Sequence, residues 1–288
     1  MPDLTFDAIG TSWTITTEER LSTAARAAVA DLVDGYDRIY SRFRPDSVIA
    51  PLARAAGTVQ LPPSAAPLLR LFDALHRLTG GAVNPLVGHS LESLGYDAAY
   101  SFASSGPSAA PDWTATAGWQ PTENGTLLST TAPATFDIGA AGKGQLVDLV
   151  FDLLLADGHR SLTVDAGSDL QHAGQHGLRV ALEHPYDTTR AVGVLPLQNR
   201  ALCASAGSRR QWGEGLHHIV DAGTGRPVEA VAATWVLAED AMTADGLATA
   251  LFFTDPGPLA EEFAFDYVRM FSDGRATFSD AMAGVLFS

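Results

Sequence analysis

Residues 137–145 read DIGAAGKGQ and join a strand-like run at 134–138 to a strongly apolar helix expected at 145–156. Lys143 in this stretch is the only lysine among the 18 lysine and arginine residues of the chain. A glycine-rich turn before a helix offers backbone N–H groups and a positive helix end to anions, and lysine adds a compact point charge. The stretch therefore suggests a phosphate-bearing ligand, and a surface lysine left by a compositional bias is the alternative.

The glycine spacing in this stretch excludes the two common phosphate-binding motifs. Two residues separate Gly139 from Gly142, and Gly144 follows the lysine. A Walker A loop needs four residues between its glycines and a Ser or Thr after the lysine. The G-x-G-x-x-G spacing of a dinucleotide-binding turn is not present in the stretch either. The stretch alone therefore does not identify its ligand.

The composition describes an acidic globular chain. It has 288 residues, of which 46% are hydrophobic and 18% are charged, and its formal net charge is −15. This charge argues against bulk electrostatic binding to nucleic acid or to an anionic membrane. Cys203 is the one cysteine, so an intrachain disulfide is excluded, and its apolar neighbours favour a place in the core.

The sequence shows no sign of membrane insertion or export. Its apolar runs are all shorter than a transmembrane helix. Residues 1–10 have neither the basic start nor the apolar core of a signal peptide. The residues given before the first motif, FDAIGT, include no lipid-anchoring cysteine. We therefore expect a cytoplasmic protein, with a trimmed exported protein as the alternative. The oligomeric state is not predicted by any feature of the sequence.

The order of the expected elements favours an α+β fold in a single domain, residues 1–288, because strands and helices mix without regular alternation. A capped helix is expected from Thr17 to about Ile39. A long surface excursion is expected at about 101–125, which is rich in Ser, Ala, Pro and Gly. The other expected elements are strands at 5–16 (broken at Gly10), 161–165, 177–183, 191–197, 232–238, 267–271 and 284–287, and helices at 64–78 and 242–253.

Asp245 and Thr249 are candidates for a metal site. They are four residues apart in an expected helix, so both side chains lie on one helical face. A carboxylate and a hydroxyl, completed by a backbone carbonyl and substrate oxygens, suit Mg²⁺ better than zinc. The alternative is a plain helix start, with Thr243 as the N-cap and Asp245 near the positive helix end.

The segment HHIVDAG, residues 217–223, is the candidate for proton transfer, because histidine titrates near neutral pH. The segment has no Cys or Glu at zinc-ligand spacing, which argues against a zinc site. The alternative is a strand that ends in a turn, with one histidine packed and the other exposed. Residues 164–170 form another strand end with a tight turn, which either lines a ligand cleft or is a plain capped turn.

Taken together and in order, these segments resemble the ApbE family, the FAD:protein FMN transferases. The resemblance covers nearly the whole chain and rests on seven short motifs. These are FDAIGT (6–11), SRFRPDSVIAPL (41–52), TGGAVNP (79–85), DIGAAGKGQLVD (137–148), LTVDAGSDL (162–170), HIVDAGTGRP (218–227) and ADGLATA (244–250). The resemblance implies an ApbE-like α+β fold of mixed sheets and helices, with two intimate lobes and a cofactor cleft.

The resemblance also implies a reaction. FMN would pass from FAD to a threonine hydroxyl of an acceptor protein, and AMP would be released. The residues that would bind FAD are Gly10, Thr11, Asp137, Lys143, Asp169 and Ser205. The groups that would hold Mg²⁺ are the side chains of Asp245 and Thr249 and the backbone carbonyl of Ala140.

Three residues would act in catalysis on this resemblance. His218 would take the proton of the attacking hydroxyl, since a hydroxyl is a poor nucleophile without a base. Lys143 would contribute positive charge at the pyrophosphate, where charge must be neutralised during cleavage. Asp221 would orient either the turn or the base.

The sequence keeps the charged residues of the family pattern and departs from it in residues that set shape, among them Asn84, Ser168 and Ala222. We therefore expect a transferase. One alternative is a hydrolase that splits FAD into FMN and AMP with water as the acceptor. The other is an FAD-binding protein without catalysis.

Overall fold

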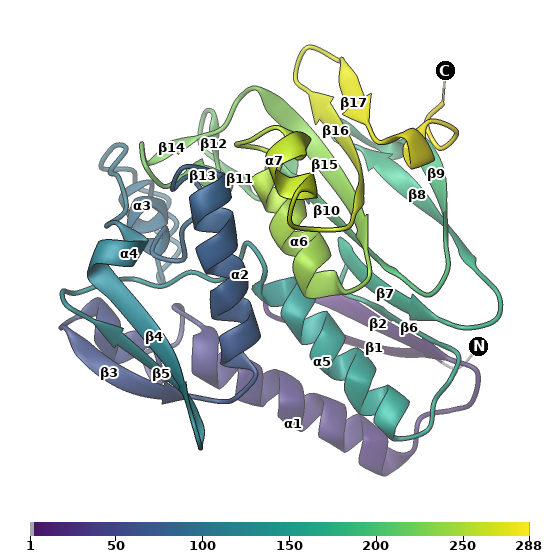
Figure 1. The fold of residues 1–288 in the computed structure, drawn as a ribbon, viewed down its shortest axis with the longest axis horizontal. Coiled ribbons are helices and arrows are strands. Elements are labelled where there is room, and N and C mark those ends of the chain that lie inside the picture. Colours follow the sequence, from purple (N-terminus) through teal and green to yellow (C-terminus); the bar gives the residue numbers. More distant parts are fainter. Residues whose placement is uncertain (1–2, 288) are drawn as a thin grey trace.

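The computed structural model describes residues 3–287, and its centre is an antiparallel sheet (Figure 1). Within these residues the sheet has eight strands in the order β1-β2-β6-β7-β10-β15-β16-β17. Their bounds are β1 Asp3–Ala8, β2 Thr11–Thr17, β6 Leu162–Asp165, β7 Asp169–Ala173, β10 Ala201–Ala206, β15 Val231–Ala238, β16 Asp266–Phe271 and β17 Ala276–Phe278.

The main sheet is covered on both faces, which explains why every residue of β15 is buried. Successive side chains of a strand point to opposite faces. Val236 and Ala238 of β15 accordingly belong to the main core, whereas Trp235 and Leu237 belong to a second core. That second core lies under the hairpin formed by β8 (Leu178–His184) and β9 (Asp187–Leu197).

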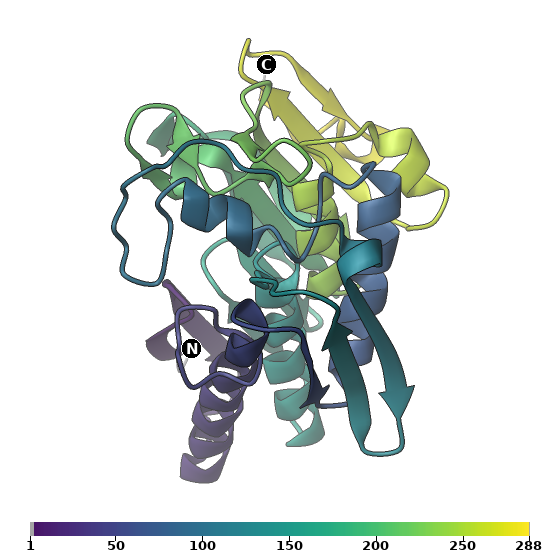
Figure 2. The same ribbon diagram turned by 90° about the vertical axis from the view of Figure 1, so that its left-hand side faces the viewer.

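Two apolar helices cover the main-core face of the sheet: α5 (Gly142–Ala156) and α6 (Ala241–Ala250), which pack against each other. Outside them lie α1 (Thr23–Tyr40), against α5, and α2 (Ala65–Leu78), against α6 (Figure 2). The shorter helices are α3 (Gly88–Ser93), α4 (Trp113–Thr116), α7 (Pro256–Ala260), and the 3-10 turns η1 (Ala50–Ala53), η2 (Gly207–Arg209) and η3 (Asp280–Met282).

Residues 18–161 form a long excursion between the neighbouring strands β2 and β6. The excursion contains α1 to α5 and a small antiparallel sheet of β3 (Gly57–Leu61), β5 (Gly125–Thr130) and β4 (Ala117–Thr122). The expected irregular segment at 101–125 is therefore wrong in its second half. Trp113 there is 2% exposed, and the indole N–H groups of Trp113 and Trp119 both donate to the Asp73 carboxylate, at 2.6 and 2.9 Å.

Two other expectations near the site need correction. The first helix begins after Ser22, whose hydroxyl accepts a hydrogen bond from the Ala25 N–H at 3.0 Å, whereas Thr17 ends β2 opposite Leu162. Ser22 therefore supplies the N-cap that the sequence suggested for Thr17. Residues 134–138 form no strand with the described residues. The N–H groups of Ala134 and Asp137 donate instead to the carbonyls of Leu52 and Pro85, which are not in strands.

Near the C-terminus, residues 284–287 make only one bridge, Gly193 to Leu286, instead of the expected strand. The helix after β15 ends at Ala250, and its N-cap is Asp240, which accepts from the Thr243 N–H at 2.7 Å. The remaining strand and helix expectations agree with the structure to within a few residues. The mixed α+β architecture is confirmed. None of the helices in residues 3–287 is long and apolar enough to cross a lipid bilayer.

Candidate active site

The junction between α5 and α6 brings together the three groups that the sequence suggested for a metal. Gly144 allows this close approach, because a Cβ at this position would lie 2.1 Å from the Ala241 carbonyl oxygen. The Gly144 N–H donates to Asp245 Oδ2 at 3.0 Å. One turn further along α6, the Thr249 hydroxyl donates to the Ala140 carbonyl at 3.3 Å. Thr249 and the Ala140 carbonyl are thus in contact, and Asp245 lies one turn away.

These oxygens form a donor set that fits Mg²⁺. Asp245 is 4% exposed, and its Oδ1 accepts no hydrogen bond from residues 3–287. Burial raises the pKa of Asp245 well above its usual range, the nearby Asp169 adds to this, and Lys143 opposes it. A buried carboxylate of this kind favours a cation beside it. The described residues contain no group of three His, Cys, Asp or Glu side chains with metal-binding geometry, so the other ligands of a magnesium ion would be phosphate oxygens and water.

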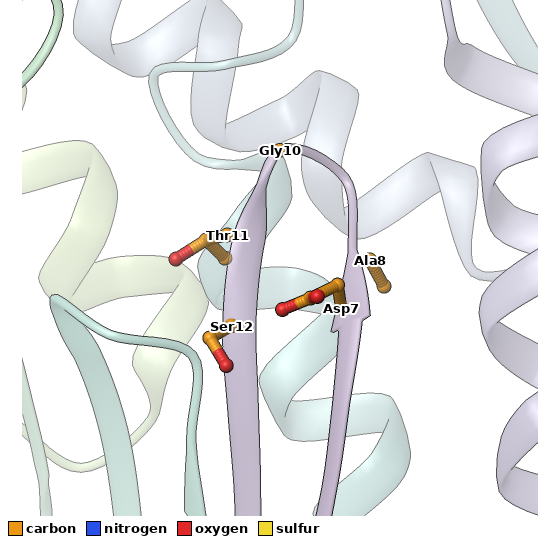
Figure 3. A pocket seen from close by; sticks show the side chains of 5 residues that line it. All are labelled: Asp7, Ala8, Gly10, Thr11 and Ser12. Atoms are coloured by element: carbon orange, nitrogen blue, oxygen red, sulfur yellow. The ribbon is translucent and has the colours of Figure 1, made fainter.

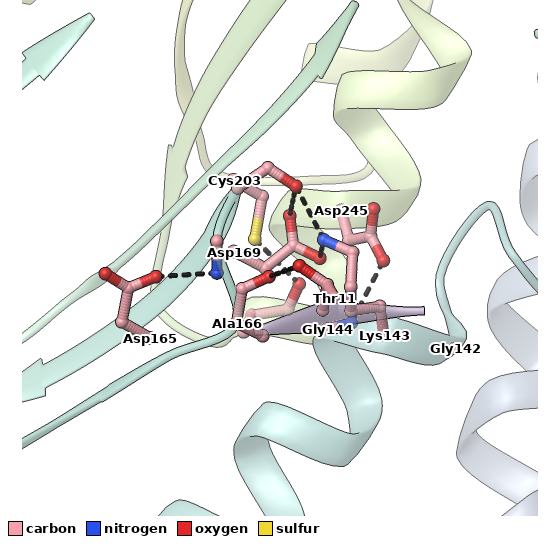
Figure 4. Close-up of polar contacts among 12 residues, drawn as sticks. Thr11, Gly142, Lys143, Gly144, Asp165, Ala166, Asp169, Cys203 and Asp245 are labelled. Carbon is pink, nitrogen blue, oxygen red and sulfur yellow. Dashed lines mark hydrogen bonds and ion pairs between the residues drawn. The ribbon is translucent and has the colours of Figure 1, made fainter. Parts of the chain in front are cut away.

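Lys143 lies in a cluster that we call the lysine cluster: Lys143, Ser168, Asp169 and Asp245 (Figure 4). Its ammonium group forms an ion pair with the fully buried Asp169 and donates to the Ser168 hydroxyl at 2.7 Å. Burial lowers the pKa of Lys143, but the carboxylates of Asp169 and Asp245 outweigh burial, so the pKa is raised. The partners of Lys143 in this structure are therefore protein groups, and its predicted contact with a pyrophosphate stays a prediction.

The hairpin between β1 and β2 places Gly10 and Thr11 next to this cluster. Gly10 has φ of 77°, a conformation that favours glycine. The Thr11 hydroxyl donates to the Ala166 carbonyl at 3.3 Å, and Ala166 is two residues before Ser168 in the chain. A hollow of about 490 Å³ opens at the hairpin and is lined by Asp7, Ala8, Gly10, Thr11 and Ser12 (Figure 3). The two residues predicted for cofactor binding thus line open space.

Asp137 is held by Arg42, a residue that the sequence analysis did not single out. Arg42 Nε donates to Asp137 Oδ2 at 2.7 Å, and the Gly139 N–H donates to Oδ1 at 2.8 Å. Burial raises the pKa of Asp137, but Arg42 and this N–H outweigh burial, so the pKa is lowered. The Arg42 guanidinium lies over the rings of Phe43 and Tyr96, 4.1 and 5.1 Å from their centroids. Asp137 is therefore an ionised and fixed carboxylate.

The two histidines differ in their surroundings, and both are largely buried. His217 Nε2 lies 2.9 Å from the Val228 carbonyl oxygen, so this ring holds a turn together. His218 Nδ1 is buried and has no hydrogen-bond partner among the described residues. Burial, with Arg210 nearby, lowers the pKa of His218 to about 4. The His218 ring is therefore uncharged at neutral pH, as a proton acceptor must be.

The Asp221 carboxylate holds its own turn. Its Oδ1 accepts hydrogen bonds from the N–H groups of Gly223 and Thr224, at 2.8 and 3.3 Å. Of the two roles that the resemblance left open, this geometry favours orientation of the turn. Ser205 lies half-buried on β10, opposite Thr234. Since side chains two apart share a strand face, Ser205 lies on the same face as Cys203, which is buried beside the lysine cluster.

Arg210 is a second basic residue that the sequence analysis did not single out. Its Nη2 lies 3.5 Å from the point that a Cβ would occupy if Gly10 had one. Its positive charge lowers the pKa of Asp137 and of His218. We call Gly10, Asp137, Arg210 and His218 the arginine cluster. The signal that could have revealed it is the Arg209-Arg210 pair in an acidic chain, directly after the segment that contains Ser205.

Comparisons with known proteins identify the family of this chain. The sequence pattern of the ApbE family matches residues 9–264. The FAD:protein FMN transferase of Klebsiella pneumoniae is 27% identical over 274 residues, which cover 86% of this chain and 77% of that protein. The enzyme of the same name from Rhodobacter capsulatus is 31% identical over 219 residues, or 69% of this chain, but the match spans only 40% of that longer protein.

Solved structures show the same fold. The flavin transferase ApbE from Vibrio cholerae superimposes with a TM-score of 0.80 at 23% identity, covering 99% of this chain and 98% of that one. The ApbE protein of Thermotoga maritima gives a TM-score of 0.82 at 21% identity and covers 99% of both chains. With the family pattern matched over most of the sequence, this chain belongs to the ApbE family.

Proposed function

We propose that this protein transfers FMN from FAD to a threonine hydroxyl of an acceptor protein and releases AMP. One observation carries the proposal: the glycine-permitted α5–α6 junction gathers the Ala140 carbonyl, Asp245 and Thr249 near the half-buried Lys143. Phosphoryl-group transfer needs such a combination of metal-binding oxygens and positive charge. The relatives named FAD:protein FMN transferase support the same reaction.

The proposed reaction forms one bond and breaks one, and a residue of the site accepts the proton that is released. The hydroxyl oxygen of the acceptor forms a bond to the flavin-side phosphorus of FAD, and the bond from this phosphorus to the bridging oxygen breaks. AMP leaves with the bridging oxygen. The hydroxyl proton goes to His218, whose Nδ1 is unpartnered among residues 3–287. The lowered pKa keeps this ring neutral but weakens it as a base, an effect that the negative charge of a bound substrate opposes.

The protein side of the site supplies the positioning. Asp245, Thr249 and the Ala140 carbonyl would hold Mg²⁺, and when bound it supplies charge neutralisation on the pyrophosphate. Lys143 pairs with Asp169 and adds positive charge at the same place. Gly10 and Thr11 leave room for the substrate at the hairpin. Lys143 lies in the first turn of α5, and Asp245 and Thr249 lie on α6. With the β1–β2 hairpin, these regular elements suit the alignment of attacking and leaving oxygens.

The experiment is a transfer assay with purified protein, FAD, Mg²⁺ and a panel of acceptor domains. Transfer gives a fluorescent acceptor band that survives denaturing electrophoresis, together with one AMP for each flavin attached. A Thr→Val change in the acceptor should remove the label. Asp245→Ala should abolish turnover, whereas Asp152→Ala, a carboxylate on the exposed face of α5, serves as the matched control.

Three outcomes separate the proposal from its rivals. AMP and free FMN without a labelled acceptor would indicate the hydrolase. Tight FAD binding without AMP release from any acceptor would indicate a binding protein without catalysis. Full activity of Asp245→Ala would refute the metal site while leaving the transfer reaction itself intact.

A further inference from the structure

Arg210 is an arginine in the site whose side chain has no partner among the described residues, 3–287. Within residues 3–287 its guanidinium makes neither a hydrogen bond nor an ion pair, although the chain has a net charge of −15. The preceding residue behaves differently, because Arg209 pairs with Glu183 at 3.1 Å. An unpaired cation in an acidic protein is a place where the binding of an anion is electrostatically favourable.

The backbone around Arg210 is fixed on both sides. Before it, Gly207 lies against the His217 ring, and a Cβ there would be 3.4 Å from this ring. After it, Trp212 is buried, stacks on Tyr96 with ring centroids 5.0 Å apart, and donates its indole N–H to the Leu94 carbonyl at 2.7 Å. The side chain is therefore free at its tip but anchored at its base, which reduces the entropy lost when it binds a ligand.

The neighbours of Arg210 come from separate elements of the site. Nη2 lies in van der Waals range of the Gly10 turn. The positive charge also acts on His218, on Tyr96 and on Asp245 of the lysine cluster. The guanidinium therefore lies next to the hairpin, and its charge reaches both the proposed base and the proposed metal site.

We propose that Arg210 binds the pyrophosphate of FAD, an inference that rests on the proposed function. Lys143 already has two partners in Asp169 and Ser168, whereas Arg210, next to the Gly10 turn, has none within residues 3–287. A guanidinium presents a planar fork of donors that matches the oxygens of a phosphate. Arg210 would therefore hold the phosphate chain, and Lys143 would position the carboxylates of its cluster.

The test compares FAD binding to the full-length protein in the presence of Mg²⁺, measured by flavin fluorescence, for Arg210→Gln and Arg209→Gln. Both variants remove one positive charge from adjacent positions, but Arg209 points to Glu183. Loss of a charged hydrogen bond predicts an affinity for FAD lower by about 10- to 100-fold in Arg210→Gln. Arg209→Gln should remain within about threefold of the parent protein, as is usual for a screened surface charge.

Two further readouts test whether the contact is electrostatic and whether it needs the planar guanidinium. FAD binding by Arg210→Gln should depend less steeply on salt than binding by the parent protein, because one charge contact is missing. Arg210→Lys keeps the charge and loses the fork, so its affinity should lie between those of the parent and Arg210→Gln. An unchanged FAD affinity, or an equal loss in Arg209→Gln, would overturn the assignment. Transfer by the parent protein tests the reaction separately, so failure of either idea is recognisable.

Discussion

The lysine cluster and the arginine cluster differ in how their cations are paired. In the first, Lys143 is 16% exposed at its side chain and is paired with a fully buried carboxylate. In the second, Arg210 is half-buried and has no partner among residues 3–287. Removing one member of a buried pair leaves an uncompensated charge, whereas removing an unpaired half-exposed cation leaves nothing unsatisfied. Lys143 therefore stabilises the fold as well as adding charge to the site, whereas the role proposed for Arg210 is to bind a ligand.

This contrast is sharpest in folding stability. Lys143→Met leaves Asp169 buried without its counter-charge, so we expect a loss of about 3–5 kcal/mol in the free energy of unfolding, measured by urea denaturation at pH 7. The double variant Lys143→Met/Asp169→Asn removes both charges and should regain a large part of this loss. A Lys143→Met protein as stable as the parent would contradict the role assigned to this pair.

His218 extends the comparison to pH. Its pKa is lowered by burial to about 4 in the folded protein, against an ordinary value of about 6.5. Between these values the unfolded chain binds more protons, so the contribution of His218 is complete above pH 6.5 and is lost as the pH falls to about 4. This loss is about 3 kcal/mol at 1.36 kcal/mol for each pKa unit.

The measurement is the free energy of unfolding from pH 4 to 7. His218→Gln should have a shallower acid limb than the parent protein, and the exposed His176→Gln serves as the control. Because the carboxylates titrate in all three proteins, the difference between the curves isolates His218. Parallel curves for the parent and His218→Gln would show that the ring is not buried as described.

Gly144 tests the close approach that builds the lysine cluster. A Cβ there would lie 2.1 Å from the Ala241 carbonyl oxygen and 2.8 Å from the Asp245 Cβ. Gly144→Ala should therefore push α5 from α6, costing about 1–3 kcal/mol and raising the Mg²⁺ concentration needed for transfer. Gly35→Ala in α1, where a Cβ meets no atom within 4 Å, should instead stabilise by about 0.5–1 kcal/mol.

The smallest effect is expected from Arg210 on the fold. Arg210→Gln should change the free energy of unfolding by less than about 0.5 kcal/mol, even though it weakens FAD binding. Thermal denaturation of the free protein measures this directly. A large destabilisation would mean that Arg210 has a structural partner, and the distinction between the two clusters would fail.

Sequence reasoning reached the groups that sit on regular elements. The sequence predicted that Asp245 and Thr249 share one helical face, because helical periodicity is local. It predicted the glycine-rich start of α5 for the same reason. The partners of Lys143 were not readable, since Asp169 joins it only through the pairing of β6 and β7 beneath α5. Arg42 and Arg210 lie in loops, where local patterns do not fix the direction of a side chain.

One error in element assignment and one departure from the family pattern have the same origin. The irregular composition near residue 113 hid a hairpin whose tryptophans are anchored by Asp73, forty residues earlier in the chain. Asn84, a departure from the family pattern, is 5% exposed and has both ends of its amide bonded, to the Pro111 carbonyl and the Leu86 N–H. Hydrogen bonds between polar groups far apart in the chain determine local structure here, but they produce no periodic pattern in the sequence.

The long excursion between β2 and β6 has a consequence for how the molecule forms. Thr17 pairs with Leu162, so the hairpin carrying Gly10 and Thr11 joins the rest of the sheet only after residues 18–161 have closed into a loop. Contacts of such high sequence separation slow folding, because the entropy of loop closure is lost before the contacts form. The two sides of the site would therefore meet late, and a refolding chain should gain helical signal well before it can retain FAD.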